Sequence, residues 1–233
     1  MKTSRSAGNP HGHDRYAFAW EYVPPDSRCH LDIGCYDGEF LVSLKGKMAG
    51  KLVGADVSLD AIREARAKAP DTEFVHLDRT VPLPFAKETF TFVTILDVLE
   101  HVYEQEELLQ ELHRVMVPAG RLIVTTPRQY LLSFLDLGNL KFLFPRLHRW
   151  YYCRRHSRQA YEYRYVSNPC GLVGDISARK RWHEHFTASR LGGLLERSGF
   201  RVVCFDGSAF FTRPMVLLDQ ASNRFGWYKE LAK

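Results

Sequence analysis

The chain has 233 residues, of which 45% are hydrophobic and 25% are charged, and its formal net charge is +5. These proportions are typical of a globular protein and exclude an intrinsically disordered chain. The length fits one ordinary domain that carries an insertion. The mild positive charge permits an anionic partner but does not require one.

Two features of the chain bear on its cellular compartment. Residues 1–14 are polar and lack the apolar core of a secretory signal or membrane span, so we expect a flexible tail. The five cysteines form no CxxC pair and no metal-ligand spacing, which favours reduced thiols. Both features predict a cytoplasmic protein.

Hydrophobic runs and helix signals alternate along most of the chain. In chain order we expect a helix over 16–22, a strand over 29–33, a helix over 39–48, a strand over 51–55, a helix over 59–69, strands over 73–77 and 90–96, a helix over 104–117 and a strand over 121–126. The alternation returns with a helix over 188–198 and strands over 200–205 and 215–218. This order predicts an α/β fold with a doubly wound, mostly parallel sheet.

Acidic residues and glycines follow the ends of the expected strands. Asp32 closes the first strand and leads into a turn that contains Gly34 and Gly38. Glycine is needed where φ is positive or where a side chain would block a ligand. Asp56 ends the second strand with Val57 beside it, at a spacing where a carboxylate accepts the hydroxyls of a ribose. The pattern therefore predicts a nucleoside-like cofactor at the carboxyl edge of the sheet.

Two further acids, Asp78 and Asp97, follow the third and fourth strands, and the segments 84–85 and 111–122 come between and after them. Taken in this order, residues 28–126 resemble the class I S-adenosylmethionine (SAM) dependent methyltransferases, in their small-molecule branch. The resemblance implies a Rossmann-like fold and SAM as the cofactor. It also departs from the family at one position, because Tyr36 stands where a glycine is common.

The resemblance implies a role for each matched residue. It places Asp32 and Gly34 beside the methionine part of SAM, and it implies that Gly38 lets the following helix approach the cofactor. It assigns the ribose to Asp56, the adenine to Asp78, and the sulfonium with its amino acid portion to Asp97. A nicotinamide dinucleotide enzyme of the same architecture is the main alternative for the cofactor. Its G-x-G-x-x-G fingerprint fails here, because Tyr36 and Glu39 occupy the second and third glycine positions.

Methyl transfer to a hydroxyl group is helped by a base, and histidine titrates near neutral pH. His101 follows the fourth strand, and His185 precedes the point where the core resumes, so these two are the candidate bases. A hydrogen-bonded structural histidine is the alternative interpretation of each. The motif His183-Glu184-His185 also suggests a metal, but the sequence provides no third ligand cluster, so we expect no metal site.

We expect residues 15–127 to form the SAM-binding core, residues 128–186 a helical cap that carries the substrate, and residues 187–233 a helix and strands that complete the core. The cap is crowded with aromatic residues and arginines between 130 and 165. Three interpretations stay open for it: an amphipathic lid, a peripheral contact with an anionic membrane, or an RNA-binding surface. Charged and polar residues within its apolar runs exclude a bilayer span.

The combined prediction is a SAM-dependent methyltransferase that acts on a small or lipid-linked, bulky and apolar acceptor, at oxygen. The large apolar cap favours such an acceptor, and we do not expect a nucleic acid partner. The alternative is a SAM-fold binding protein without turnover, or an RNA-directed methyltransferase that uses the basic aromatic insertion. The sequence does not indicate an oligomeric state.

Overall fold

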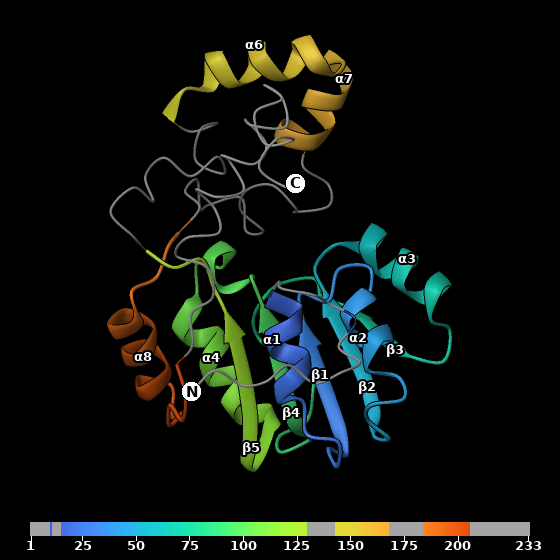
Figure 1. Ribbon diagram of the computed structural model, residues 1–233, viewed down its shortest axis with the longest axis vertical. Coiled ribbons are helices and arrows are strands. Elements are labelled where there is room, and N and C mark those ends of the chain that lie inside the picture. Colours follow the sequence, from blue (N-terminus) through green and yellow to red (C-terminus); the bar gives the residue numbers. More distant parts are fainter. Residues whose placement is uncertain (1–9, 11–14, 130–142, 168–183, 206–233) are drawn as a thin grey trace, which may run out of the picture. The chain divides into compact units, whose positions relative to one another are not determined.

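The computed structural model describes residues 10, 15–129, 143–167 and 184–205. Its centre is a sheet of five strands, in the order β3-β2-β1-β4-β5, in which every pairing is parallel. The strands are β1 (Cys29–Ile33), β2 (Lys51–Asp56), β3 (Glu73–His76), β4 (Phe90–Leu96) and β5 (Met116–Thr125). Because the order reverses at β1, the carboxyl ends of β1 and β4 form the switch point where ligands bind in such sheets (Figure 1).

Helices cover both faces of this sheet. They are α1 (Arg15–Tyr22), α2 (Glu39–Leu44), α3 (Leu59–Lys68), η1 (Leu99–His101), α4 (Gln105–Val115) and α8 (Ala188–Arg197). Apolar residues of α1, α2 and α3 pack with Phe74 and Phe92 on one face, and those of α4 and α8 pack with Val93 and Ile95 on the other. The doubly wound α/β fold is thus confirmed.

Local sequence signals explain where these helices begin and end. The Ser58 hydroxyl accepts a hydrogen bond from the Ala61 backbone N–H and caps α3, which ends shortly before Pro70. In α4, the residues buried against the sheet recur at helical spacing, namely Leu108, Leu109, Leu112 and Val115. Burial of that stripe fixes α4 beneath β4 and β5.

Two boundaries differ from the expectation by more than two residues, and one expected strand is absent from the described residues. The second helix ends at Leu44 rather than at Met48, because Lys45 is extended and Gly46 has a φ of 92°. The fifth strand begins at Met116 rather than at 121, with an irregularity in its pairing to β4. The expected strand over 200–205 is wrong, since residues 201–205 have no regular structure.

The expected insertion contains α6 (Pro145–Arg155), α7 (Arg158–Tyr161) and η3 (Glu162–Ser167). The rest of it, 130–142 and 168–183, lies outside the described residues, as do the expected tail, apart from Pro10, and the expected strand over 215–218. The compact unit that carries the sheet extends to Arg201 and therefore includes α8. Among the described helices, none combines the length and the apolar character needed to cross a bilayer.

Candidate functional site

All the cofactor residues predicted from the sequence lie at the carboxyl edge of the sheet. Asp32 is the second-last residue of β1, Gly34 follows this strand, and Gly38 is the N-cap of α2. Asp56 ends β2 and is followed by Val57, while Asp78 and Asp97 follow β3 and β4. Parallel strands bring their carboxyl ends to one edge, which is why residues far apart in sequence meet here.

The Asp56 carboxylate is tied to the turn that follows β1. Its Oδ2 accepts a hydrogen bond of 2.9 Å from the Tyr36 backbone N–H, and its Oδ1 accepts one of 2.8 Å from the Ser58 N–H. Burial raises the pKa of Asp56, and the backbone donors at Ser58 and Tyr36 lower it. These contacts hold a carboxylate in one orientation beside the first turn.

Tyr36 has a φ of 49°, so it adopts the left-handed conformation that a glycine would adopt at this position. The departure from the family pattern therefore leaves the backbone path of the turn intact. The cost of this conformation in a non-glycine residue is about 1–2 kcal/mol.

The two glycines of the turn each have a local reason to be glycine. Gly34 has a φ of 73°, and a Cβ atom there would lie 2.2 Å from Cγ2 of Val98. Gly38 has a φ of 76°, and a Cβ atom there would lie 2.7 Å from Cζ of Phe74. Side chains at these positions would displace Val98, which follows β4, and Phe74 of β3.

Asp32 belongs to a buried chain of three polar side chains. The Thr94 hydroxyl donates a hydrogen bond of 2.6 Å to Asp32 Oδ1, and Nε2 of His30 lies 2.8 Å from the same hydroxyl oxygen. Burial raises the pKa of Asp32 to about 7, against a lowering effect of the bond from Thr94. Burial also lowers the pKa of His30 to about 3. Neither His30 nor Thr94 was predicted from the sequence as part of the site.

A small apolar recess opens at the same edge, with a cavity volume of about 20 Å³. Its lining includes the predicted Gly34, Asp56 and Val57 together with Ile33, Leu77, Thr80, Val98, Val102 and Leu108. Asp78 is not part of it, since its side chain is 93% exposed and faces His76 at 3.6 Å. The recess thus brings Gly34 and Asp56 together, and Asp78 lies apart from them.

Asp97 is anchored to the neighbouring strand. Its backbone N–H donates to the carbonyl oxygen of Thr125 at 3.0 Å, and the Thr125 hydroxyl donates to its carboxylate at 2.8 Å. Asp97 itself has a φ of 52°, which turns the chain sharply from β4 into η1. The turn carries the residues after Asp97 across the carboxyl edge.

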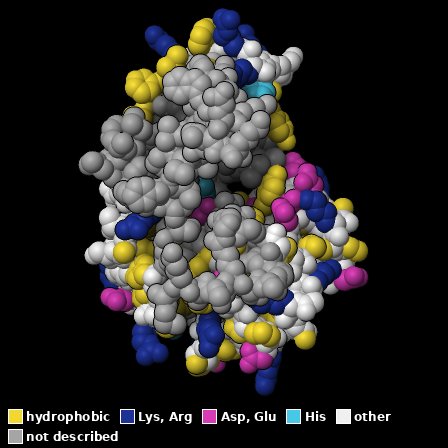
Figure 2. Space-filling model, in the orientation of Figure 1, with side chains coloured by type: hydrophobic (Ala, Val, Ile, Leu, Met, Phe, Trp, Pro, Cys, Tyr) yellow, Lys and Arg dark blue, Asp and Glu magenta, His cyan; other side chains and the backbone are white. Residues whose placement is uncertain are grey.

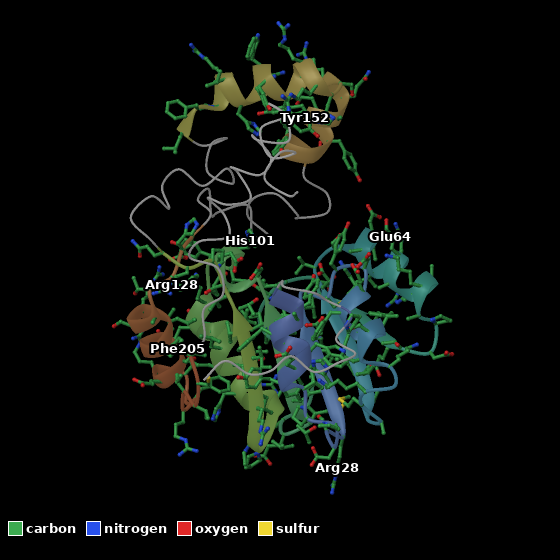
Figure 3. The ribbon with its side chains drawn as sticks, in the orientation of Figure 1. Arg28, Glu64, His101, Arg128, Tyr152 and Phe205 are labelled. Carbon is green, nitrogen blue, oxygen red and sulfur yellow. The ribbon has the colours of Figure 1, made fainter. Side chains whose placement is uncertain are left out.

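The two candidate bases, His101 and His185, lie on two segments that both accept hydrogen bonds from Gln105. The Gln105 amide donates to the Leu99 carbonyl at 3.0 Å and to the Glu184 carboxylate at 2.7 Å. His101 ends η1, and its position at the carboxyl edge is visible in Figure 3. His185 is buried in the segment of Phe186, which pairs with Arg128 just after β5. The region that the structure describes contains no cluster of three potential metal ligands.

Residues 11–204 match a family model described as a methyltransferase domain. Since this match covers most of the chain, the protein belongs to that methyltransferase family. Membership of this family implies S-adenosylmethionine as the cofactor.

The chain is also similar to individual methyltransferases. It is 28% identical over 121 residues to the demethylmenaquinone methyltransferase of Oceanobacillus iheyensis, covering 49% of this chain and 51% of that protein. It is 33% identical over 99 residues to the enzyme of the same name from Thermus thermophilus, covering 40% and 44%. The chain thus spans about half the length of the curated relatives it matches.

Solved structures show the same fold. Phosphoethanolamine N-methyltransferase 2 of Haemonchus contortus, in complex with S-adenosyl-L-methionine, matches with a TM-score of 0.58 at 13% identity, covering 93% of this chain and 43% of that one. A SAM-dependent methyltransferase of Thermotoga maritima matches with a TM-score of 0.51 at 21% identity, covering 80% and 70%. These likenesses establish the class I methyltransferase architecture.

The residues at the edge fit this cofactor chemically. The oriented Asp56 carboxylate is a hydrogen-bond acceptor of the kind that a ribose needs, and Val57 and Leu77 supply apolar walls beside it. The acids at this edge suit a cofactor with a positively charged sulfur and an ammonium group. A dinucleotide pyrophosphate would meet Glu39 at the start of α2, where its binding turn has a glycine.

Proposed function

We propose that this protein transfers the methyl group of S-adenosylmethionine to a bulky, apolar acceptor of the quinone type. The observation that carries the proposal is the oriented Asp56 carboxylate at the turn after β1, beside the apolar recess. The acceptor class is supported by the relatives named demethylmenaquinone methyltransferase. A peripheral contact with an anionic membrane fits such an acceptor, because apolar ring compounds partition into lipid.

The cofactor residues act by binding and orientation. We assign the ribose hydroxyls to Asp56, the adenine to the walls formed by Val57 and Leu77, and the methionine part to the turn at Gly34 with Asp32 behind it. Asp97 stays assigned to the sulfonium and amino acid portion and Asp78 to the adenine amino group. Positioning of this kind lowers the activation free energy of a displacement by several kcal/mol, and by roughly 7–11 kcal/mol in well-oriented cases.

When bound, S-adenosylmethionine supplies a methyl group on a sulfonium sulfur, and the sulfur leaves as a neutral thioether. We propose that the acceptor nucleophile is a hydroxyl oxygen, as in a reduced quinone. An acceptor hydroxyl that attacked this methyl group would have to pass its proton to a base of the protein. His101 and His185 are the two candidates for that base, because both lie at the carboxyl edge.

Incubation with SAM carrying a labelled methyl group and a panel of acceptors tests this proposal. The panel contains a demethylated naphthoquinol, a benzoquinol and a small polar catechol. We expect label in the naphthoquinol or benzoquinol products, and fragmentation by mass spectrometry locates it on oxygen or carbon. Transfer to the polar catechol alone would contradict the acceptor class, and label on carbon would contradict the oxygen nucleophile.

A further inference from the structure

Helix α6 exposes a row of large apolar side chains. Leu147 is 59% exposed, Trp150 57% and Tyr151 49%, and none of the residues of α6 is buried. Their spacing of three and four residues places them on one face of the helix. Phe144, just before the helix, is also exposed. Exposed apolar surface concentrated on one face marks an interaction site in a soluble domain.

The same segment is strongly basic. Between residues 143 and 167 the sequence has six arginines, at 146, 149, 154, 155, 158 and 164, and a single acid, Glu162. Glu162 is paired with Arg149 at 2.8 Å. Figure 2 shows hydrophobic and basic side chains side by side over the α6 region at the top of the picture. An excess of positive charge beside apolar side chains predicts a partner that is both apolar and anionic.

The arginines lie directly against the exposed aromatic rings. The Arg154 guanidinium is 5.3 Å from the centre of the Trp150 ring, and that of Arg155 is 4.5 Å from the centre of the Tyr151 ring. An arginine that stacks on an aromatic ring keeps its donors available at the edge of the guanidinium plane. The aromatic and cationic groups therefore form one surface rather than two separate patches.

The opposite face of α6 is occupied within this segment. The Tyr152 ring makes edge-to-face contacts with Tyr161 of α7 and Tyr165 of η3, at ring separations of 5.8 and 5.0 Å, and those two rings are 5.1 Å apart. Figure 3 labels Tyr152 on this inner side. Because Tyr152 lies about 140° around the helix from Leu147 and about 160° from Trp150, the exposed row faces away from the cluster that Tyr152 forms with α7 and η3.

We propose that the row of Phe144, Leu147, Trp150 and Tyr151, with its flanking arginines, docks on the surface of an anionic lipid bilayer. The apolar and aromatic side chains would enter the boundary between headgroups and acyl chains, and the arginines would reach the lipid phosphates. Aliphatic side chains such as Leu143 and Leu147 enter lipid but cannot stack on nucleic acid bases, so the composition favours lipid over RNA. The inference rests on the proposed function in one respect: docking would bring the active site to an apolar acceptor that is dissolved in the membrane.

Vesicle flotation of the purified full chain tests the proposal. We expect binding to vesicles of phosphatidylcholine with about one third phosphatidylglycerol, and little binding to phosphatidylcholine alone, with release at high salt. The double variant Leu147→Ser with Trp150→Ser and the double variant Arg154→Gln with Arg155→Gln should each weaken binding by about tenfold or more. The matched controls are Leu59→Ser and Arg63→Gln on α3, where a leucine and an arginine are similarly exposed, and these should bind as the unmodified protein does.

Three results would overturn the docking surface: no binding to anionic vesicles, binding that both α6 variants retain, or capture of a single-stranded RNA by the α6 arginines without vesicle binding. Urea unfolding and SAM affinity, measured on the same variants, show that the core is intact. Vesicle binding without methyl transfer would support the docking surface and contradict the proposed function. Methyl transfer without vesicle binding would support the proposed function and contradict the docking surface.

Discussion

The Thr94 hydroxyl donates a 2.6 Å hydrogen bond to Oδ1 of Asp32, and both side chains are buried in the centre of the sheet. A hydroxyl group has one hydrogen, so Thr94 must accept the bond that joins it to Nε2 of His30. Nε2 of His30 therefore carries a proton, and burial, which lowers the pKa of His30 to about 3, keeps the ring neutral near pH 7. The chain of three residues orients the carboxylate at the end of β1.

The hydrogen bond between Thr94 and Asp32 should contribute measurably to the free energy of unfolding. Thr94→Val leaves the buried Asp32 carboxyl and the His30 ring nitrogen without this hydroxyl, so we expect a loss of about 1–3 kcal/mol in the free energy of unfolding. Thr94→Ser keeps the hydroxyl and should lose less. Urea unfolding near neutral pH measures both. Equal stability of Thr94→Val and the unmodified protein would contradict the role of this bond.

The pH dependence of stability should contain two opposed contributions. The pKa of Asp32 is raised from 3.8 to about 7, so the folded state keeps a proton that the unfolded state has lost, and this contribution falls as pH rises through that window. The pKa of His30 is lowered from 6.5 to about 3, so the unfolded state gains a proton that the folded state does not, and this contribution falls as pH drops below 6.5. Between about pH 4 and 6.5 the two oppose each other.

Single variants separate the two contributions. In Asp32→Asn only His30 remains, so unfolding free energy should fall more steeply than in the unmodified protein as pH drops below 6.5. In His30→Leu only Asp32 remains, so unfolding free energy should rise, relative to the unmodified protein, as pH drops from 7 toward 4. Urea unfolding across this range gives both slopes. Two variants with the pH profile of the unmodified protein would show that these groups do not titrate as described.

Asp56 should dominate the affinity for the cofactor. Its carboxylate is oriented by Tyr36 and Ser58, and we assign the ribose hydroxyls to it. Asp56→Ala should weaken SAM binding by at least about tenfold, since a charge-assisted hydrogen bond contributes roughly 1.5–3 kcal/mol. Asp60→Ala, an exposed position on α3, is the control. Calorimetric affinity of Asp56→Ala equal to that of the control would remove Asp56 from the site.

The two histidines at the edge should differ in their effect on turnover. Replacement of the true base by alanine should lower kcat by about 10²- to 10⁴-fold and leave SAM affinity nearly unchanged. His101→Ala and His185→Ala, assayed with the same acceptor, identify which one acts. A histidine whose variant keeps full turnover has no part in the proton transfer.

The sequence was sufficient for the parts of the fold that depend on local patterns. The apolar runs of β1 and β4 and the stripe of Leu108, Leu109 and Leu112 on α4 predicted the sheet and its helices closely. The end of α2 was missed although Gly46 is a local signal that ends a helix. The start of β5 was missed because it depends on an irregular pairing with β4.

The candidate site was predictable where it depends on chain order and not where it depends on cross-strand contacts. The acids at strand ends could be identified because parallel strands align their carboxyl ends. Chain order did not identify Thr94 and Thr125, because each hydroxyl donates to an acid that is distant in sequence. Asp32 lies 62 residues from Thr94, and Asp97 lies 28 residues from Thr125. A polar residue inside an otherwise apolar strand, such as Thr94 in β4 or His30 in β1, was the signal that could have identified the buried chain.

Calorimetric titration of the purified protein with S-adenosylmethionine, with NAD as the parallel ligand, tests the central claim most directly. We predict micromolar binding of S-adenosylmethionine and none of NAD, because Asp56 can bind a ribose whereas Tyr36 and Glu39 occupy two glycine positions of the turn that a pyrophosphate needs. Binding of NAD, or no binding of S-adenosylmethionine to a correctly folded protein, would contradict the account.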